Sequence, residues 1–146
     1  MVEMIPPERM IADSVELITG TSSGTVADLQ VQYDGNNYQA EEVTGVPGID
    51  LRINFKNILR FSKITYTAYY KGSTSHYVEV QLFNYKTGVW EVYTTIPYAL
   101  GMNTRYFDTA DFDEHIKNGE VMIRFYHPIS GTAAHDLFID YVALIR

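Results

Sequence analysis

The residues with the clearest potential for chemistry lie close together in the stretch 124–144, RFYHPISGTAAHDLFIDYVAL. It holds two of the four histidines and two aspartates, namely His127, His135, Asp136 and Asp140. Imidazoles and carboxylates at such short spacing could bind a metal ion or exchange protons. A zinc site needs a third and usually a fourth ligand, and the other two histidines are far away in sequence. We therefore expect His127 and His135 to hydrogen-bond to loop backbone instead.

Two kinds of catalytic site can be drawn from these residue types, and neither has the surroundings it needs. Ser130 lies near both histidines, but the G-x-S-x-G elbow that exposes a nucleophilic serine is missing. Glycoside hydrolysis needs two converging carboxylates, and the candidates are Glu41, Glu42, Glu79 and Glu91. Alternation along the chain places most of these on the solvent side of strands. The sequence therefore predicts a protein that is not an enzyme.

The stretch itself is predicted to be a β-hairpin, with strands over 120–127 and 135–144 and a turn near Gly131. In that register the odd-numbered positions are apolar and face the core. The even-numbered side mixes aromatic, charged and apolar residues: Met122, Arg124, Tyr126, Asp136, Phe138, Asp140, Val142 and Leu144. Arg124 and Asp140 would be diagonal neighbours that could form an ion pair. A carboxylate inside a strand must be solvated, paired or metal-bound, so Asp140 needs one of these partners.

The rest of the chain shows short alternating runs separated by turn residues. Strands are predicted over 14–19, 25–33, 37–43, 49–55, 63–70, 76–85 and 88–96, with a hairpin turn at Asp34-Gly35. Residues 108–119 have capping residues at both ends and predict one or two helical turns. The predicted fold is all-β, an antiparallel β-sandwich or jelly roll of about 8–10 strands with one short helix. Residues 14–146 form this domain, and residues 1–13 form an extended N-terminal arm that is either disordered or docked on a neighbouring subunit.

Composition limits the partners that the protein can have. The net charge is −7, which argues against nucleic acid and against electrostatic docking on anionic membranes, and leaves room for cations and neutral sugars. No apolar run approaches the ~20 residues of a membrane span, so membrane insertion is not expected. The start of the sequence lacks a secretory signal, so any role outside a cell requires another route of release, such as lysis. Without cysteines, the redox compartment cannot be inferred.

Several segments resemble the galactose-binding-like jelly rolls typical of carbohydrate-binding modules. LFIDYVAL (137–144) is similar to their last strand, and YDGNNYQAEEV (33–43) resembles an early strand. VEVQLFNYKTGVWEVY (78–93) and residues 121–142 are similar to small sandwich domains of tailed-bacteriophage virion proteins. The resemblance implies a phage tail protein, a receptor-binding adhesin for a host cell-surface glycan. It also implies assembly with other virion proteins as a homo-oligomer, often a trimer, and a structural calcium ion near the last strand. The virion particle would then be its location.

Candidate site residues follow from what sugar binding requires, which is aromatic rings for the pyranose faces and polar groups for the hydroxyls. The ligand-binding candidates are Arg124, Tyr126, Phe138, Asp140, Tyr69 and Asn84. The candidate calcium ligands are Asp140, Glu41 and Glu42. Alternation predicts that Tyr66, Tyr70 and Trp90 fill the core. A purely structural role in virion assembly or decoration is the alternative, and a glycan-degrading enzyme is a more distant one.

Overall fold

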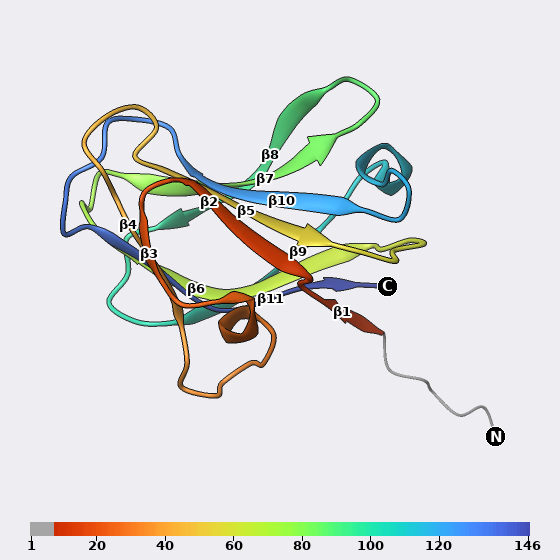
Figure 1. Cartoon of the computed structure of the whole chain (residues 1–146), viewed down its shortest axis with the longest axis horizontal. Coiled ribbons are helices and arrows are strands. Elements are labelled where there is room, and N and C mark those ends of the chain that lie inside the picture. Colours follow the sequence, from red (N-terminus) through yellow and green to blue (C-terminus); the bar gives the residue numbers. More distant parts are fainter. Residues whose placement is uncertain (1–7) are drawn as a thin grey trace.

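The chain forms two antiparallel sheets that pack face to face, as Figure 1 shows for the computed structural model, which describes residues 8–146. The six-stranded sheet has the order β3 (Thr21–Ser23), β4 (Tyr38–Glu41), β11 (Asp136–Ile145), β6 (Lys63–Lys71) and β9 (Asn103–Asp108), and β1 (Arg9–Ile11) also pairs with β11. The five-stranded sheet has the order β2 (Ser14–Thr19), β5 (Ile49–Phe55), β10 (Val121–His127), β7 (Tyr77–Asn84) and β8 (Val89–Pro97). The predicted all-β sandwich is therefore confirmed.

The core lies between the two sheets and is built by strict alternation. In β10 every second residue is fully buried, at Val121, Ile123 and Phe125, while the residues between them are only partly buried. From Leu51 onward β5 repeats this pattern beside it, while Asp50 is buried on the other side of the strand. Because side chains alternate across a strand, each sheet turns one apolar face inward and one more polar face outward.

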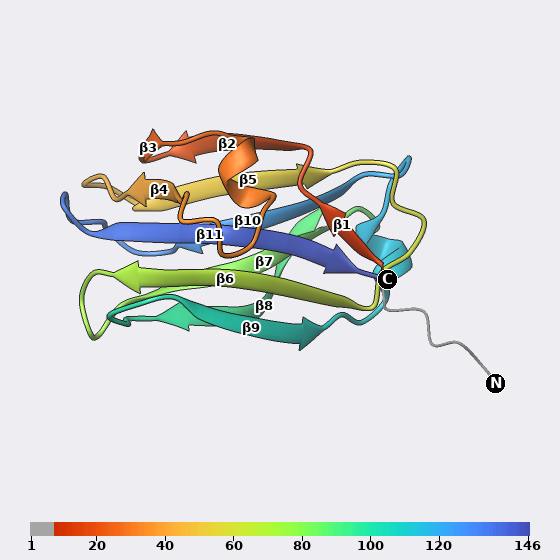
Figure 2. The ribbon, with the colours of Figure 1, turned by 90° about the horizontal axis from the view of Figure 1, so that it is seen from below.

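The predicted hairpin of the last two strands is wrong, because β10 and β11 belong to different sheets. β10 lies between β5 and β7, whereas β11 lies between β4 and β6. Figure 2 shows β4, β11, β6 and β9 side by side in the other layer. The odd positions of both strands still point into the core as far as Ile139, since each sheet presents one face to it. A register shift between Ile139 and Tyr141 then turns Val142 and Leu144 inward, although the sequence had placed them on the mixed side.

Three other segments differ from the prediction. Residues 25–33, predicted as a strand, instead contain the 3-10 helix η1 (Val26–Leu29), because Asp28 accepts a hydrogen bond from the amide of Thr25 and completes a capping box. The helix predicted over 108–119 is reduced to η2 (Phe112–His115), a single 3-10 turn. β9 was not predicted at all. Within the described part of the chain, no helix is long and apolar enough to cross a membrane.

The predicted arm over 1–13 falls partly outside the described residues, which begin at residue 8. Inside them, Arg9 pairs with Ile145 and Ile11 pairs with Ala143, so this part of the arm extends a sheet of its own chain.

Candidate functional site

The outer side of the five-stranded sheet gathers aromatic rings and planar polar groups. We call this surface the aromatic–arginine face, and it consists of Asp50 and Arg52 from β5, Arg124 and Tyr126 from β10, Gln81 from β7 and Trp90 from β8. The strand register sets these residues beside one another. Arg124 lies opposite both Arg52 and Gln81, and Tyr126 lies opposite Asp50.

Arg124 is the centre of the face. Its guanidinium carbon lies 4.4 Å from the centre of the Trp90 ring and 4.0 Å from the centre of the Tyr126 ring. Its Nε and Nη2 atoms donate to Gln81 Oε1 at 2.8 and 2.6 Å. Only 13% of the side chain is exposed. Burial lowers the pKa of Arg124, and the nearby charge of Asp50 opposes this shift. The two rings are thus held in place by a cation stacked against both of them.

A second arginine, Arg52, is held beside Arg124 and Trp90 by Asp50. Arg52 donates from Nε and Nη2 to the two carboxylate oxygens of Asp50, at 3.2 and 3.1 Å, which is the planar two-bond geometry that arginine favours. Its guanidinium carbon also lies 5.4 Å from the centre of the Trp90 ring. Asp50 Oδ2 lies 3.8 Å from Arg124 Nη1, so one carboxylate serves both arginines.

Trp90 lies on this outer face and not in the core, which corrects the prediction from sequence. Trp90 is partly exposed, and its partner on β7 is Phe83. Val92, which lies two positions further along β8 on the same side, is 53% exposed. The reason is a register shift between β7 and β8 at Val80 and Gln81. Such a shift reverses which positions of β8 face outward, so Trp90 does not share the face of the even-numbered positions that follow the shift. Local apolar alternation cannot reveal such a shift, because it depends on the partner strand.

Of the predicted ligand-binding residues, the structure brings Arg124 and Tyr126 together and places the others elsewhere. Phe138 and Tyr69 lie on the outer side of the six-stranded sheet, with their rings stacked at 4.8 Å. Asp140 is also in that sheet and is only 4% exposed. The expected Arg124–Asp140 pair is therefore wrong, since the two residues lie in different sheets.

Asp140 and Asn84 have structural partners within the chain. The carboxylate of Asp140 accepts a hydrogen bond from the amide of Tyr33 at 2.7 Å. Burial raises the pKa of Asp140, the bond from Tyr33 opposes this, and nearby Asp34 raises it further. The side chain of Asn84 accepts from the amides of Lys86 and Thr87 at 2.9 and 3.0 Å, so it caps the turn between β7 and β8.

The three predicted calcium ligands do not share a site. Glu41 lies opposite Asp136, four positions along β11 from Asp140, which is about 13 Å along a strand. Glu42 is buried in the sandwich and accepts a hydrogen bond from Tyr70. Across residues 8–146, no group of three or more histidine, aspartate or glutamate side chains is arranged to hold a metal ion. Calcium binding itself stays a prediction, which a melting curve with calcium and then with a chelator would test.

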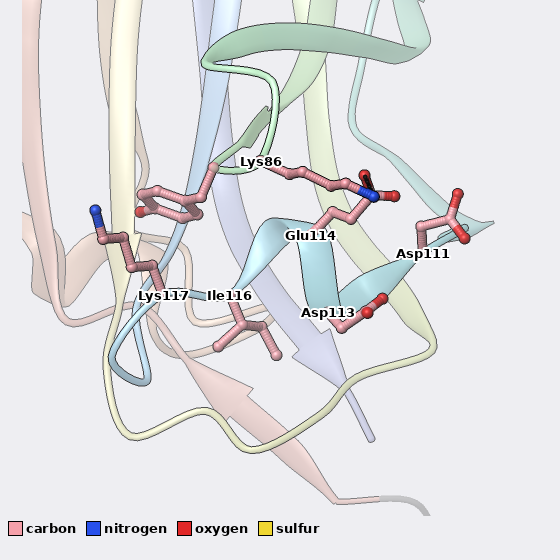
Figure 3. A pocket seen from close by; sticks show the side chains of 7 residues that line it. Lys86, Asp111, Asp113, Glu114, Ile116 and Lys117 are labelled. Atoms are coloured by element: carbon pink, nitrogen blue, oxygen red, sulfur yellow. Dashed lines mark ion pairs between the residues drawn. The ribbon is translucent and has the colours of Figure 1, made fainter.

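A hollow beside η2 offers a different kind of surface. Figure 3 shows its charged lining, in which Lys86 and Glu114 form an ion pair at 3.9 Å and Asp111, Asp113 and Lys117 stand nearby. The hollow has a volume of about 520 Å³. Tyr85 and Ile116 also line the hollow, but most of its lining residues are charged, with both signs present, and its one aromatic ring is not stacked on an arginine as in the aromatic–arginine face.

Comparison with known proteins agrees with the fold. No known family model matches the chain, and no curated protein matches it in sequence. Among solved structures, a variant of a family 29 carbohydrate-binding module complexed with cellulohexaose is 14% identical, with a TM-score of 0.62, covering 97% of this chain and 93% of that one. A xylan-binding module of family 15 is 13% identical with a TM-score of 0.58, covering 95% of this chain and 96% of that one. A family 4 module is 16% identical with a TM-score of 0.55, covering 95% of each chain. The chain thus has the jelly-roll fold of these modules.

Proposed function

We propose that this chain is a non-catalytic carbohydrate-binding domain whose ligand lies on the aromatic–arginine face. The observation that carries the proposal is the stack of Trp90, Arg124 and Tyr126, fixed by Gln81 and Asp50. Sugar rings present apolar C–H faces and a rim of hydroxyls, which suit flat aromatic rings beside fixed donors and acceptors. The fold shared with solved carbohydrate-binding modules supports the same conclusion.

The side chains of the face form one compact cluster, although they come from four strands. Trp90 stands on β8 and Arg52 on β5, three strand spacings apart in the sheet. With neighbouring strands ~4.8 Å apart, their backbones lie about 14 Å apart. The Arg52 side chain nevertheless reaches back to 5.4 Å from the centre of the Trp90 ring. Because its polar groups are already paired with one another, the site is preorganised, and little side-chain entropy is lost on binding.

Titration calorimetry with cellulohexaose, mannohexaose and soluble xylan would test the proposal, since these are ligands named for the structural neighbours. The panel should also include surface polysaccharides from bacteria. We expect Trp90→Ala to weaken binding of the recognised glycan by about 2 kcal/mol, roughly 30-fold, as removal of a central aromatic anchor does. The matched control is Tyr106→Ala on the other sheet, where the ring is 55% exposed. Equal losses for the two variants would contradict the assignment of the site.

We further propose a bacteriophage virion as the setting, with a host cell-surface glycan as the receptor. This rests on the sequence resemblance of residues 121–142 and 78–93 to virion sandwich domains. The purified protein should then adsorb to host cells and lose that adsorption in Trp90→Ala. Light scattering tests the proposed trimer, since three chains of 16.7 kDa give about 50 kDa. A mass of a single chain at micromolar concentration would contradict it.

A further inference from the structure

One end of the sandwich contains a buried carboxylate surrounded by two histidines and a tyrosine. Glu42 is 1% exposed, and its Oε1 atom lies 2.7 Å from His127 Nε2. Its Oε2 atom lies 3.1 Å from His135 Nδ1, and the Tyr70 hydroxyl donates to Oε1 at 3.0 Å. His127 is fully buried, while the side chain of His135 is 27% exposed. These groups come from four separate segments of the chain, so sequence spacing could not reveal their proximity.

The hydrogen bonds of His127 determine where its hydrogens must be. Its Nδ1 atom lies 3.0 Å from the backbone carbonyl oxygen of Tyr77. A carbonyl oxygen can only accept, so Nδ1 must carry a hydrogen. In a neutral imidazole the other nitrogen, Nε2, would then present a lone pair to Glu42 Oε1. Two lone pairs at 2.7 Å repel each other, and among the described residues His127 Nε2 has no hydrogen-bond partner.

One additional proton resolves this contact. It is held either by His127, which then pairs as an imidazolium with a carboxylate, or by Glu42, which then donates as a carboxylic acid. Tyr70 does not supply it, because burial and the bond to Glu42 both raise the pKa of the Tyr70 hydroxyl, which therefore keeps its hydrogen. Glu42 Oε2 and His135 Nδ1 lie 3.1 Å apart, but neither atom has a hydrogen-bond partner among the described residues.

We propose that Glu42 and His127 form a proton-binding site that takes up one proton when the chain folds and loosens this end of the sandwich when the proton is lost. The other titratable groups packed around the pair are Tyr70 of β6, His76 and His135 of the adjoining loops, and Glu41 of β4.

The surrounding backbone explains why loss of the proton has structural consequences. The amide of Glu42 donates to the carbonyl of His135, and the amide of Gly48 donates to the carbonyl of His127. The loops around Gly48 and Gly131 touch, because a Cβ atom on Gly48 would lie 2.8 Å from Gly131 Cα and 2.6 Å from His127 Cδ2. Both side chains are buried beside these touching loops, so we expect relief of a repulsive contact between Glu42 and His127 to move the loops apart.

Urea unfolding over about pH 7.5 to 9 tests the proposal by comparing the full chain with Glu42→Gln. Unfolded histidine and glutamate have lost their protons in this range. The unfolding equilibrium constant of the native protein should therefore rise with pH relative to that of the variant, by at most tenfold per pH unit, because one proton is released on unfolding. In Glu42→Gln the amide nitrogen can donate to neutral His127 and to Tyr70, and the amide oxygen can accept from His135, so no extra proton is needed.

Glu41→Gln is the matched control, because it removes the same charge from the neighbouring residue and should keep the native pH dependence. Identical slopes for the native protein and Glu42→Gln would overturn the proposal. A second measurement does not depend on any variant folding. Nitrogen and carboxyl-carbon NMR of the native protein at pH 7 should find a proton on either His127 Nε2 or Glu42, and a neutral ring beside an ionised carboxylate would also overturn it.

Discussion

The stack of Trp90 on Arg124 can be measured by a double-mutant cycle with Arg124→Met and Trp90→Leu. Each change keeps an apolar side chain and removes one partner of the contact. The guanidinium lies 4.4 Å from the ring centre, and the arginine side chain is 13% exposed, so the pair is largely shielded from water. Cation–π contacts stabilise by about 0.5–1 kcal/mol when exposed and about 2 kcal/mol when desolvated. We therefore expect a coupling free energy of about 1.5 kcal/mol.

The assay is urea unfolding at 25 °C and pH 7 of the native protein, the two single variants and the double variant. The coupling is the difference between the loss of unfolding free energy in the double variant and the sum of the single losses. A matched cycle of Arg124→Met with Phe138→Leu should give zero within about 0.5 kcal/mol, because Phe138 lies in the other sheet. A coupling below about 0.3 kcal/mol for the first cycle would refute the claim that Arg124 holds the Trp90 ring. The idea of a preorganised face would then fail with it.

The remaining predictions concern stability. Gly131→Ala should lower the free energy of unfolding by about 3 kcal/mol in a urea titration, because the added Cβ atom collides with the carbonyl oxygen of Val43. The control is Gly101→Ala, which has open space around it and should leave the free energy of unfolding unchanged. Asn84→Ala should lower the free energy of unfolding by about 1.5 kcal/mol, because the amides of Lys86 and Thr87 lose their acceptor. Calorimetry should find its glycan binding unchanged. Because burial raises the pKa of Asp140, its folded form binds a proton more tightly than its unfolded form, so this group favours folding in acid and that contribution is lost as pH rises. Asp140→Asn should therefore be more stable than the native protein at neutral pH, with the advantage vanishing in acid, and an equal advantage at every pH would contradict this reasoning.

Local alternation was enough to predict most of the strands and the core residues within them. The runs 49–55 and 63–70 correspond closely to β5 and β6, because period-two alternation directly reflects the two faces of a strand. The same alternation already places Asp50, Arg52 and Asn54 on one side of β5. It identified Arg124 and Tyr126 as neighbours on one face, which the structure confirms.

Features that depend on partners distant in sequence could not be predicted in this way. Proximity in sequence suggested that β10 pairs with β11, but each strand instead pairs only with strands of its own sheet. The face of Trp90 depends on a register shift relative to β7. The contact of Glu42 with His127 joins the residue that follows β4 to the last residue of β10, in the other sheet. The two histidines predicted to bond to loop backbone therefore lie beside a buried carboxylate.

The alternation in β5 and β10 also bears on how new specificities could arise in this fold. Leu51, Ile53, Ile123 and Phe125 are completely buried, and each is followed in sequence by a residue on the opposite side of the sheet. Outward residues can therefore be exchanged in libraries without altering the volume of the core, which is where most destabilising substitutions act. The sheet behaves as a constant scaffold with a separately variable surface, and selection for a chosen ligand could operate on about six positions while the rest of the chain stays fixed.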